Sequence, residues 1–305
     1  MTIQNLFCVD LDQPSLPGFR RFISSWCWQS AGYRLLIDPG PLSTIPLLVQ
    51  KLQQAGIEHL DYILLTHIHI DHAGGTGELL KYFPDTQVIC HPDGIRHMIA
   101  PAKLWQGSLK VLGKTAEAYG EIIPIPAKQI GFTEQIGESG IRSYLTPGHA
   151  QHHCCYLDGD LLFAGEVAGV RSQVEQGIYM RPATPPRFIL DVALESIQRM
   201  IELAPRRMIF AHYGLADDAL THLEIGKKQL QLWVRGAAAT SELEGEIRVQ
   251  AFYDWLVERD ENFALITQLP EDLLLREREF IGNSLRGMAE YVAGLSDAER
   301  RLLAA

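Results

Sequence analysis

The stretch THIHIDHAGG, residues 66–75, places four side chains that can bind a metal ion within six positions. It follows a short apolar run that we interpret as a strand. Alternate residues of an extended segment point the same way, so His67 and His69 can present their imidazoles to one ion. Asp71 and His72 then face a neighbouring point as the chain enters a double glycine. A run of ordinary surface histidines would not explain this placement, and we therefore predict a metal site here.

On both sides of this stretch, short apolar runs alternate with turn signals. Strands are predicted at residues 33–37, 62–65, 87–90, 141–145, 154–157, 161–164 and 207–210. Helical patterns occupy residues 45–55, 76–83 and 188–203. The sequence Asp158-Gly159-Asp160 joins two of the strands as in a hairpin. The order of elements is typical of a mixed α/β protein.

The pattern changes toward the C-terminus. Beyond residue 216 the strand signals vanish and the chain reads as successive helices. One of them places four apolar residues on a single face: Ile281, Leu285, Met288 and Val292. Ser296 followed by Glu299 resembles a capping box that opens a final short helix. We therefore predict a catalytic domain at residues 1–235 and a helical C-terminal extension at residues 236–305, which we expect to contribute to the active-site pocket.

Composition limits the partners and the location. The 305 residues include 27 basic and 37 acidic side chains, a net charge of −10 with no basic stripe, which argues against a nucleic-acid partner. No apolar run reaches the roughly 18 residues of a membrane span, and no secretion signal is recognisable, so we expect no membrane partner and a cytoplasmic location. The five cysteines are scattered without a C-x-x-C pair, which favours a reducing compartment over a disulfide framework.

The motif H-x-H-x-D-H at residues 67–72 resembles the signature of the metallo-β-lactamase fold superfamily. Three further motifs of that family follow in its order, each after a predicted strand. They are TPGH ending at His149, FAGE ending at Glu166, where the family usually has aspartate, and FAHYG containing His212. The resemblance extends over roughly residues 5–215 and implies an α/β fold of four layers. This αβ/βα sandwich has two sheets flanked by helices, with the metals at one edge.

The resemblance also implies two divalent metal ions. The ligands carried over are His67, His69 and His149 for the first ion, Asp71, His72 and His212 for the second, and Glu166 as a bridge. Zinc is the default for imidazole and carboxylate ligands, and iron or manganese would also suit them. Asp38, in the segment LIDPG, matches an early aspartate of the family that lies near the site without binding metal.

Glu166 departs from the family pattern. Its additional methylene moves the carboxylate by about one bond length, whereas metal–ligand distances tolerate only about 0.2 Å. Glutamate can still bridge the two ions if the backbone at Gly165 shifts away from them to make room for the longer side chain. It can also bind a single ion and favour a larger one, or be an ordinary acidic residue beside a mononuclear site.

The resemblance implies hydrolysis by a metal-bound hydroxide, with Asp71 as the catalytic residue that orients it. The intact motif and the helical C-terminal region look most like the glyoxalase II and lactonase branch. We therefore expect an enzyme that hydrolyses a small carbonyl ester, thioester or lactone. The alternatives are an iron-dependent redox enzyme resembling persulfide dioxygenases, a phosphodiesterase, and a non-catalytic metal-stabilised binding protein. Oligomerisation through the C-terminal helices stays open.

Other side chains are left out of the predicted site. The cluster after His149 comprises His152, His153, Cys154 and Cys155, and its alternation into a strand favours buried cysteines over ligands. Histidines without spacing partners are assigned to the surface or core: His59, His91, His97 and His222. Three residues near the predicted mouth are candidates for holding a substrate oxygen: Tyr179, Arg181 and Tyr213.

Overall fold

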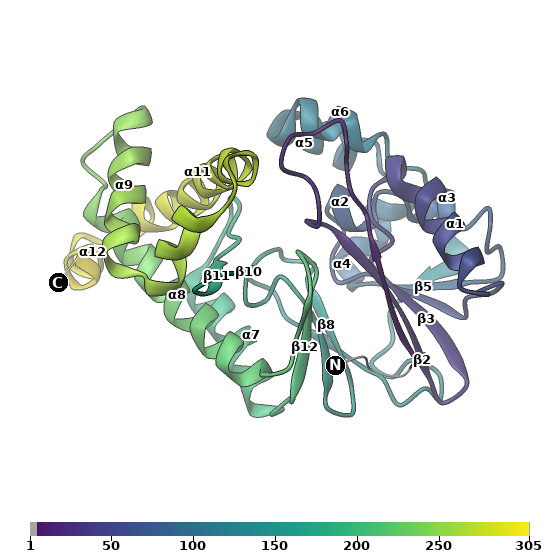
Figure 1. Cartoon of the computed structure of the whole chain (residues 1–305). Helices are drawn as coiled ribbons and strands as arrows, with labels where there is room; N and C mark the ends of the chain where they lie inside the picture. Colours follow the sequence, from purple (N-terminus) through teal and green to yellow (C-terminus); the bar gives the residue numbers. More distant parts are fainter. Residues whose placement is uncertain (1–4, 305) are drawn as a thin grey trace.

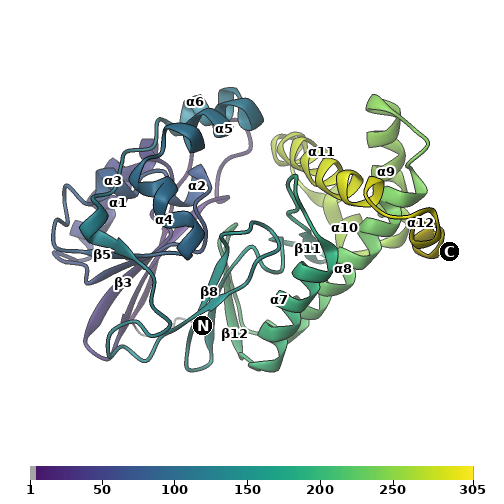
Figure 2. The same cartoon turned by 180° about the vertical axis from the view of Figure 1, so that it is seen from behind.

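The computed structural model describes residues 5–304, and two facing β-sheets form its centre (Figures 1 and 2). The first sheet consists, in spatial order, of β1 (Leu6–Asp10), β2 (Ser24–Ser30), β3 (Tyr33–Ile37), β4 (Tyr62–Leu64), β5 (Gln87–Ile89) and β6 (Ile130–Gly131). Strands β3 to β6 run parallel, while β1, β2 and β3 pair antiparallel. The parallel strands are buried, because helices cover their outer face.

The second sheet carries the later part of the chain. Its spatial order is β13 (Leu215–Ala216), β12 (Arg207–Phe210), β9 (Leu161–Gly165), β8 (Cys154–Asp158) and β7 (Arg142–Leu145). Strands β9 and β12 are parallel, and the other pairs are antiparallel. A separate hairpin consists of β10 (Val170–Val174) and β11 (Gly177–Arg181). Because β9 and β12 run parallel, their carboxyl ends meet at one edge of the sheet.

Helices cover the outer faces of both sheets (Figure 1). Helices α1 (Ile45–Gln54) and α3 (Thr76–Leu79) lie outside the first sheet, and α7 (Leu190–Glu202) and α8 (Ala219–Ala239) lie outside the second. Apolar clusters join successive layers. Leu48 of α1 and Ile63 of β4 belong to one, Leu64 of β4 and Phe163 of β9 to a second, and Leu162 of β9 and Ile197 of α7 to a third. The predicted four-layer α/β sandwich is confirmed.

The predicted helix at residues 76–83 ends after one turn, at Leu79. Pro84 follows this segment, and a proline disfavours helical backbone in the residue before it. Sequence periodicity did not reveal four helices on this side of the molecule: α2 (Ile70–Ala73), α4 (Pro92–Ile99), α5 (Ala102–Leu112) and α6 (Lys114–Tyr119). Three short 3-10 helices complete the irregular segments: η1 (Leu42–Thr44), η2 (Ala127–Gln129) and η3 (Leu265–Gln268).

After α8 the chain is helical, as expected. The remaining helices are α9 (Gly245–Arg259), α10 (Glu261–Ala264), α11 (Glu271–Ala293) and α12 (Asp297–Ala304). The predicted apolar face of α11 is buried among side chains of α8, α9 and α10. Ser296 and Glu299 form the expected capping box, with the Ser296 N–H donating to the Glu299 carboxylate at 2.8 Å. The predicted domain boundary at residue 235 falls inside α8, and the division into domains stays a prediction.

Within residues 5–304, none of the helices combines the length and the apolar character that crossing a membrane requires.

Candidate metal centre

Four of the predicted ligands come from the segment after β4. The backbone of this segment buries Ile68 and Ile70, each 1% exposed, in the core of the first half. His67 and His69 alternate with them and turn toward the second sheet. Helix α2 begins directly afterwards and carries Asp71 and His72. The local alternation that the sequence suggested therefore determines which way these side chains point.

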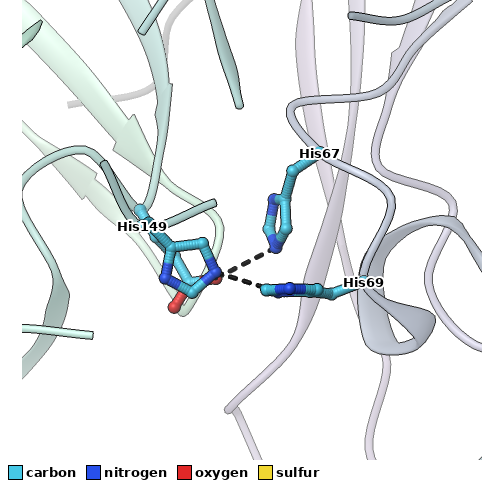
Figure 3. A group of neighbouring side chains, drawn as sticks. His67, His69 and His149 are labelled. Carbon is cyan, nitrogen blue, oxygen red and sulfur yellow. Dashed lines mark hydrogen bonds and ion pairs between the residues drawn. The ribbon is translucent and has the colours of Figure 1, made fainter. Parts of the chain in front are cut away.

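The other three ligands come from the second sheet. His149 lies in the loop between β7 and β8, Glu166 follows β9, and His212 follows β12. Figure 3 shows the imidazole of His149 facing those of His67 and His69 from the opposite side. The site thus lies between the two halves of the sandwich, at the edge where β9 and β12 end.

The seven side chains form two groups, and within each group the potential ligand atoms lie within 4.8 Å of one another. One group comprises His67, His69, His149 and Glu166, and the other comprises Asp71, His72 and His212. The structure therefore brings the seven predicted metal ligands together, with Glu166 in the group of His67, His69 and His149. Their role as ligands stays a prediction.

Glu166 reaches both groups. Its Oε2 atom lies 3.1 Å from His149 Nε2, 3.2 Å from His67 Nε2 and 3.6 Å from His72 Nε2. Its Oε1 atom lies 3.6 Å from His212 Nε2. The backbone before Glu166 is irregular: Gly165 has φ +55°, and the β9–β12 register shifts by one residue there.

The backbone hydrogen bonds of two histidines point their Nε2 atoms at the other ligand candidates. Nδ1–H of His149 donates to the Ala183 carbonyl at 2.8 Å, and Nδ1–H of His212 donates to the Phe22 carbonyl at 3.1 Å. Nε2 of His149 then lies 2.9 Å from His69 Nδ1 and 3.1 Å from the Glu166 carboxylate. Nε2 of His212 lies 3.3 Å from His72 Nε2 and 3.4 Å from the Asp71 carboxylate. A proton or a metal ion between such atoms removes the repulsion between a ring nitrogen and a carboxylate oxygen, and the imidazole and carboxylate donor set fits divalent metal ions.

The burial of the site also fits a metal. Nε2 of His67 and Nδ1 of His72 are buried and make no hydrogen bond within residues 5–304. Burial, reinforced by neighbouring imidazoles, lowers the pKa of His67 and His69 well below its usual value, which keeps both rings neutral as metal binding requires. A buried polar atom without a partner is costly, and a bound ion would satisfy it.

The second group is electrostatically different. Burial alone would lower the pKa of His72, but the adjacent Asp71 carboxylate raises it to about 9. For Asp71 the opposite holds: burial would raise its pKa, and the imidazoles of His72 and His212 outweigh this and lower it well below its usual value. The Asp71 carboxylate is therefore ionised at neutral pH, whereas the raised pKa of His72 keeps that ring protonated. A metal ion that binds this group must displace the proton from His72.

Asp38 supports the site from outside the ligand groups, as predicted. It has φ +48° and is 2% exposed, and it accepts hydrogen bonds from the Thr66 N–H at 2.8 Å and the Thr66 hydroxyl at 2.6 Å. Its Oδ2 atom also lies 3.8 Å from His72 Nδ1. Burial raises the pKa of Asp38 to about 6. Asp38 thereby fixes the beginning of the ligand segment and faces one of its imidazoles.

His153, which the sequence analysis set aside, has a structural role beside the site. Its Nε2 accepts the Glu166 N–H at 3.0 Å, so its Nδ1 carries the proton and donates to the Thr146 hydroxyl at 2.8 Å. His153 is fully buried and holds the backbone of Glu166. The register of β7 and β8 brings these groups together, and spacing along the sequence gave no signal of it.

The remaining candidates lie elsewhere. Cys154 and Cys155 are fully buried on β8, as expected. His59 is exposed, whereas His222 is buried and its Nδ1–H donates to the Asp218 carbonyl at 2.6 Å.

Tyr179 and Arg181 are buried and contact Glu277 of α11, so they do not line an open mouth as the sequence suggested. Tyr213 is partly exposed and binds Arg21.

The comparison with known families agrees with this geometry. The family model described as the metallo-beta-lactamase superfamily matches residues 19–212, which include every ligand candidate. The chain belongs to the metallo-β-lactamase superfamily. Proteins of this superfamily are mostly metal-dependent hydrolases.

Individual relatives within the superfamily are distant. The chain is 33% identical over 212 residues to the metallo-beta-lactamase fold-containing protein ST1585 of Sulfurisphaera tokodaii, covering 63% of this chain and 77% of that protein. The crystal structure of ST1585 superposes with a TM-score of 0.68 over 95% of this chain and all of the other, at 26% identity. A hydroxyacylglutathione hydrolase of Salmonella paratyphi B is 24% identical over 289 residues, covering 87% of this chain and 93% of that enzyme.

Proposed function

We propose that the chain is a hydrolase of a small carbonyl ester, thioester or lactone that uses two divalent metal ions, with zinc as the first choice. The observation that carries the proposal is the position of Glu166, whose carboxylate lies within 3.6 Å of imidazole nitrogens from both ligand groups. A carboxylate in this place can serve both ions, because its charge offsets their mutual repulsion.

The ligands of each ion follow from the two groups. His67, His69 and His149 would hold the first ion and Asp71, His72 and His212 the second, with Glu166 shared. When bound, the ions supply Lewis acidity, which makes a water more acidic and polarises the carbonyl oxygen of the substrate.

Asp71 is the best placed residue to handle a proton. Its side chain is 13% exposed, against 4% for Glu166, so a water or a substrate can reach it more readily. Its low pKa keeps it an acceptor at neutral pH. Asp71 would therefore orient the attacking water and pass its proton toward the leaving group, while His149 and His212 stay fixed by their backbone hydrogen bonds.

The similarity to a hydroxyacylglutathione hydrolase supports thioesters within the substrate class. That enzyme matches 87% of this chain, at 24% identity. We expect a cytoplasmic enzyme acting on a small molecule, without nucleic-acid or membrane partners.

The test is to strip the protein with a chelator, reload it with zinc, manganese or iron, and measure bound metal by mass spectrometry. Each form is then assayed with glutathione thioesters, lactones, phosphodiesters and β-lactams. Two ions per chain and turnover led by the carbonyl esters would support the proposal, provided that Asp71→Asn abolishes the turnover. Activity confined to phosphodiesters, or oxygen uptake with a persulfide in the iron form, would replace it with one of the alternatives. A protein that binds metal but turns over none of these would be a binding protein.

A further inference from the structure

Helix α11 of the C-terminal region contacts the loop at residues 18–22, which carries the hydrogen-bond partner of His212. We propose that Arg276 on this helix is a positioning residue for the second metal ion, acting through Phe22 on His212. This inference rests on the proposed function in one respect, namely that His212 binds an ion. Arg276 lies outside the 19–212 segment that matches the family model.

Phe22 controls the orientation of His212 in two ways. Its carbonyl accepts the Nδ1–H of His212 at 3.1 Å, which leaves Nε2 free to bind an ion. Its ring stacks on the imidazole, with the ring centroids 4.2 Å apart and the planes 22° from parallel. The hydrogen bond fixes the tautomer, and the stack fixes the plane of the ring. Any tilt of Phe22 would therefore turn Nε2 of His212 away from the other ligands.

Arg276 holds the ring of Phe22. The guanidinium carbon lies 3.9 Å from the centroid of that ring, and the side chain is 4% exposed. The same guanidinium donates through Nη1 to the Gly18 carbonyl at 2.6 Å. One side chain of α11 thus contacts both ends of the loop at residues 18–22. Its removal would loosen the backbone of this loop and would leave the ring of Phe22 with only its aromatic neighbours Phe19 and Phe280 in place of the guanidinium.

Arg276 is itself held in place. Its Nη2 and Nε atoms donate to Oε1 of Glu277 at 2.8 Å and 3.1 Å. The other carboxylate oxygen of Glu277 accepts from the Tyr179 hydroxyl at 2.8 Å and from Arg181, both on β11. Both oxygens of a fully buried carboxylate are therefore used, and the guanidinium has a fixed plane and direction. This network explains why Tyr179 and Arg181 lie in the interior.

A second contact between the same loop and the same helix provides a matched control. Arg20 binds Asp272 at 2.8 Å, but the two side chains are 52% and 38% exposed. Exposed ion pairs contribute little, and this pair does not involve the ring of Phe22. Arg20→Ala therefore removes one ion pair between the loop and α11 and leaves the stacking of Phe22 on His212 intact.

The experiment measures both ion affinities of the full-length, metal-free protein by zinc titration against a competing chelator. Arg276→Met should weaken the second ion by about 10-fold to 100-fold, as expected when a partner of a ligand is lost, and leave the first ion unchanged. Arg20→Ala should behave like wild type. Arg276→Lys keeps the charge but not the planar group, and should give an intermediate loss. In a Phe22→Leu background, Arg276→Met should add no further loss.

A second readout needs no metal and separates this inference from the proposed function. In metal-free protein, the Nδ1 proton of His212 should exchange slowly with water in NMR spectra, and Arg276→Met should accelerate that exchange. If wild type binds only one ion, the two-ion function fails, and this exchange rate alone decides the role of Arg276. The inference is overturned if a folded Arg276 variant keeps wild-type exchange, if Arg20→Ala causes the same loss, or if the loss persists undiminished in the Phe22→Leu background. Should Arg276→Met not fold, Arg276→Lys carries the same comparison.

Discussion

Replacing Gly165 by alanine should damage both the stability and the metal site. The backbone at Gly165 has φ +55°, and a Cβ atom there would lie 2.3 Å from His153 Nε2 and 2.9 Å from the Cβ of Thr66. The hairpin turn offers a control, because Gly159 has nearly the same φ, +56°, with no atom within 4 Å of an added Cβ. The two substitutions therefore share the backbone strain and differ in the steric clash.

The magnitudes follow from these two terms. A left-handed backbone costs an L-residue about 1–2 kcal/mol, which applies to both variants. Overpacking a buried position costs about 1–3 kcal/mol more and applies only to Gly165→Ala. We expect Gly159→Ala to lower the free energy of unfolding by about 1–2 kcal/mol and Gly165→Ala by about 2–5 kcal/mol.

Urea unfolding of the metal-free proteins measures this difference, and metal analysis then measures its effect on the site. The clash should push the His153 ring away from the Glu166 N–H, and the Glu166 carboxylate should move by more than the roughly 0.2 Å that metal ligands tolerate. Gly165→Ala should therefore lose bound metal, while Gly159→Ala should bind like wild type. Equal stabilities and equal metal contents in the two variants would refute the role assigned to Gly165.

Three further predictions concern single side chains. His149→Ala should abolish hydrolysis and remove bound metal, whereas replacement of the exposed His59 by alanine should change neither, as measured by kinetic assays and metal analysis. Equal losses in both variants would contradict the assignment of His149 as a metal ligand. Glu166→Asp should keep two ions and measurable turnover, and Glu166→Ala should not; full metal content and activity in the alanine variant would make this carboxylate a bystander. Burial alone would raise the pKa of Glu277, but Arg181 and Arg276 lower it to about 2. The ionised carboxylate therefore stabilises the fold above the pKa of an unfolded glutamate, about 4.3, and this stabilisation is lost as the pH falls toward 2. Glu277→Gln should accordingly be less stable at neutral pH, with a flatter dependence of the unfolding free energy between about pH 5 and pH 2, and a slope as steep as that of wild type would count against the ion pairs.

The sequence predicted the local half of the site well, because four ligands follow one another after a single strand. His149, Glu166 and His212 came from the resemblance to a family, since no spacing rule connects residues on separate strands. The structure places all seven side chains together, and their role as metal ligands stays a prediction. His153 was considered and left out of the site, because its partner Thr146 is defined by strand pairing, which a spacing rule does not capture.

Contacts between distant segments explain the other differences. Helix α5 contains no fully buried residue: its apolar side chains Leu104, Trp105 and Leu109 pack only partly buried against the core, and the sequence analysis did not identify it. Tyr179 and Arg181 follow the site closely along the chain, yet α11 covers them and supplies their acidic partner, Glu277. Their placement depended on a helix about a hundred residues away, and a local pattern cannot report such a contact.

The contact between Arg276 and Gly18 joins residues 258 positions apart and has a consequence for biosynthesis. A ribosome delivers the chain from its N-terminus, so His67 and His69 emerge long before the helix that steadies the loop around Phe22. A nascent chain that has just released His212 already carries every ligand candidate but still lacks α11. Loading of the second ion would therefore be a late, post-translational event, and a fragment ending near residue 235 should mature poorly even though it contains all seven ligand candidates.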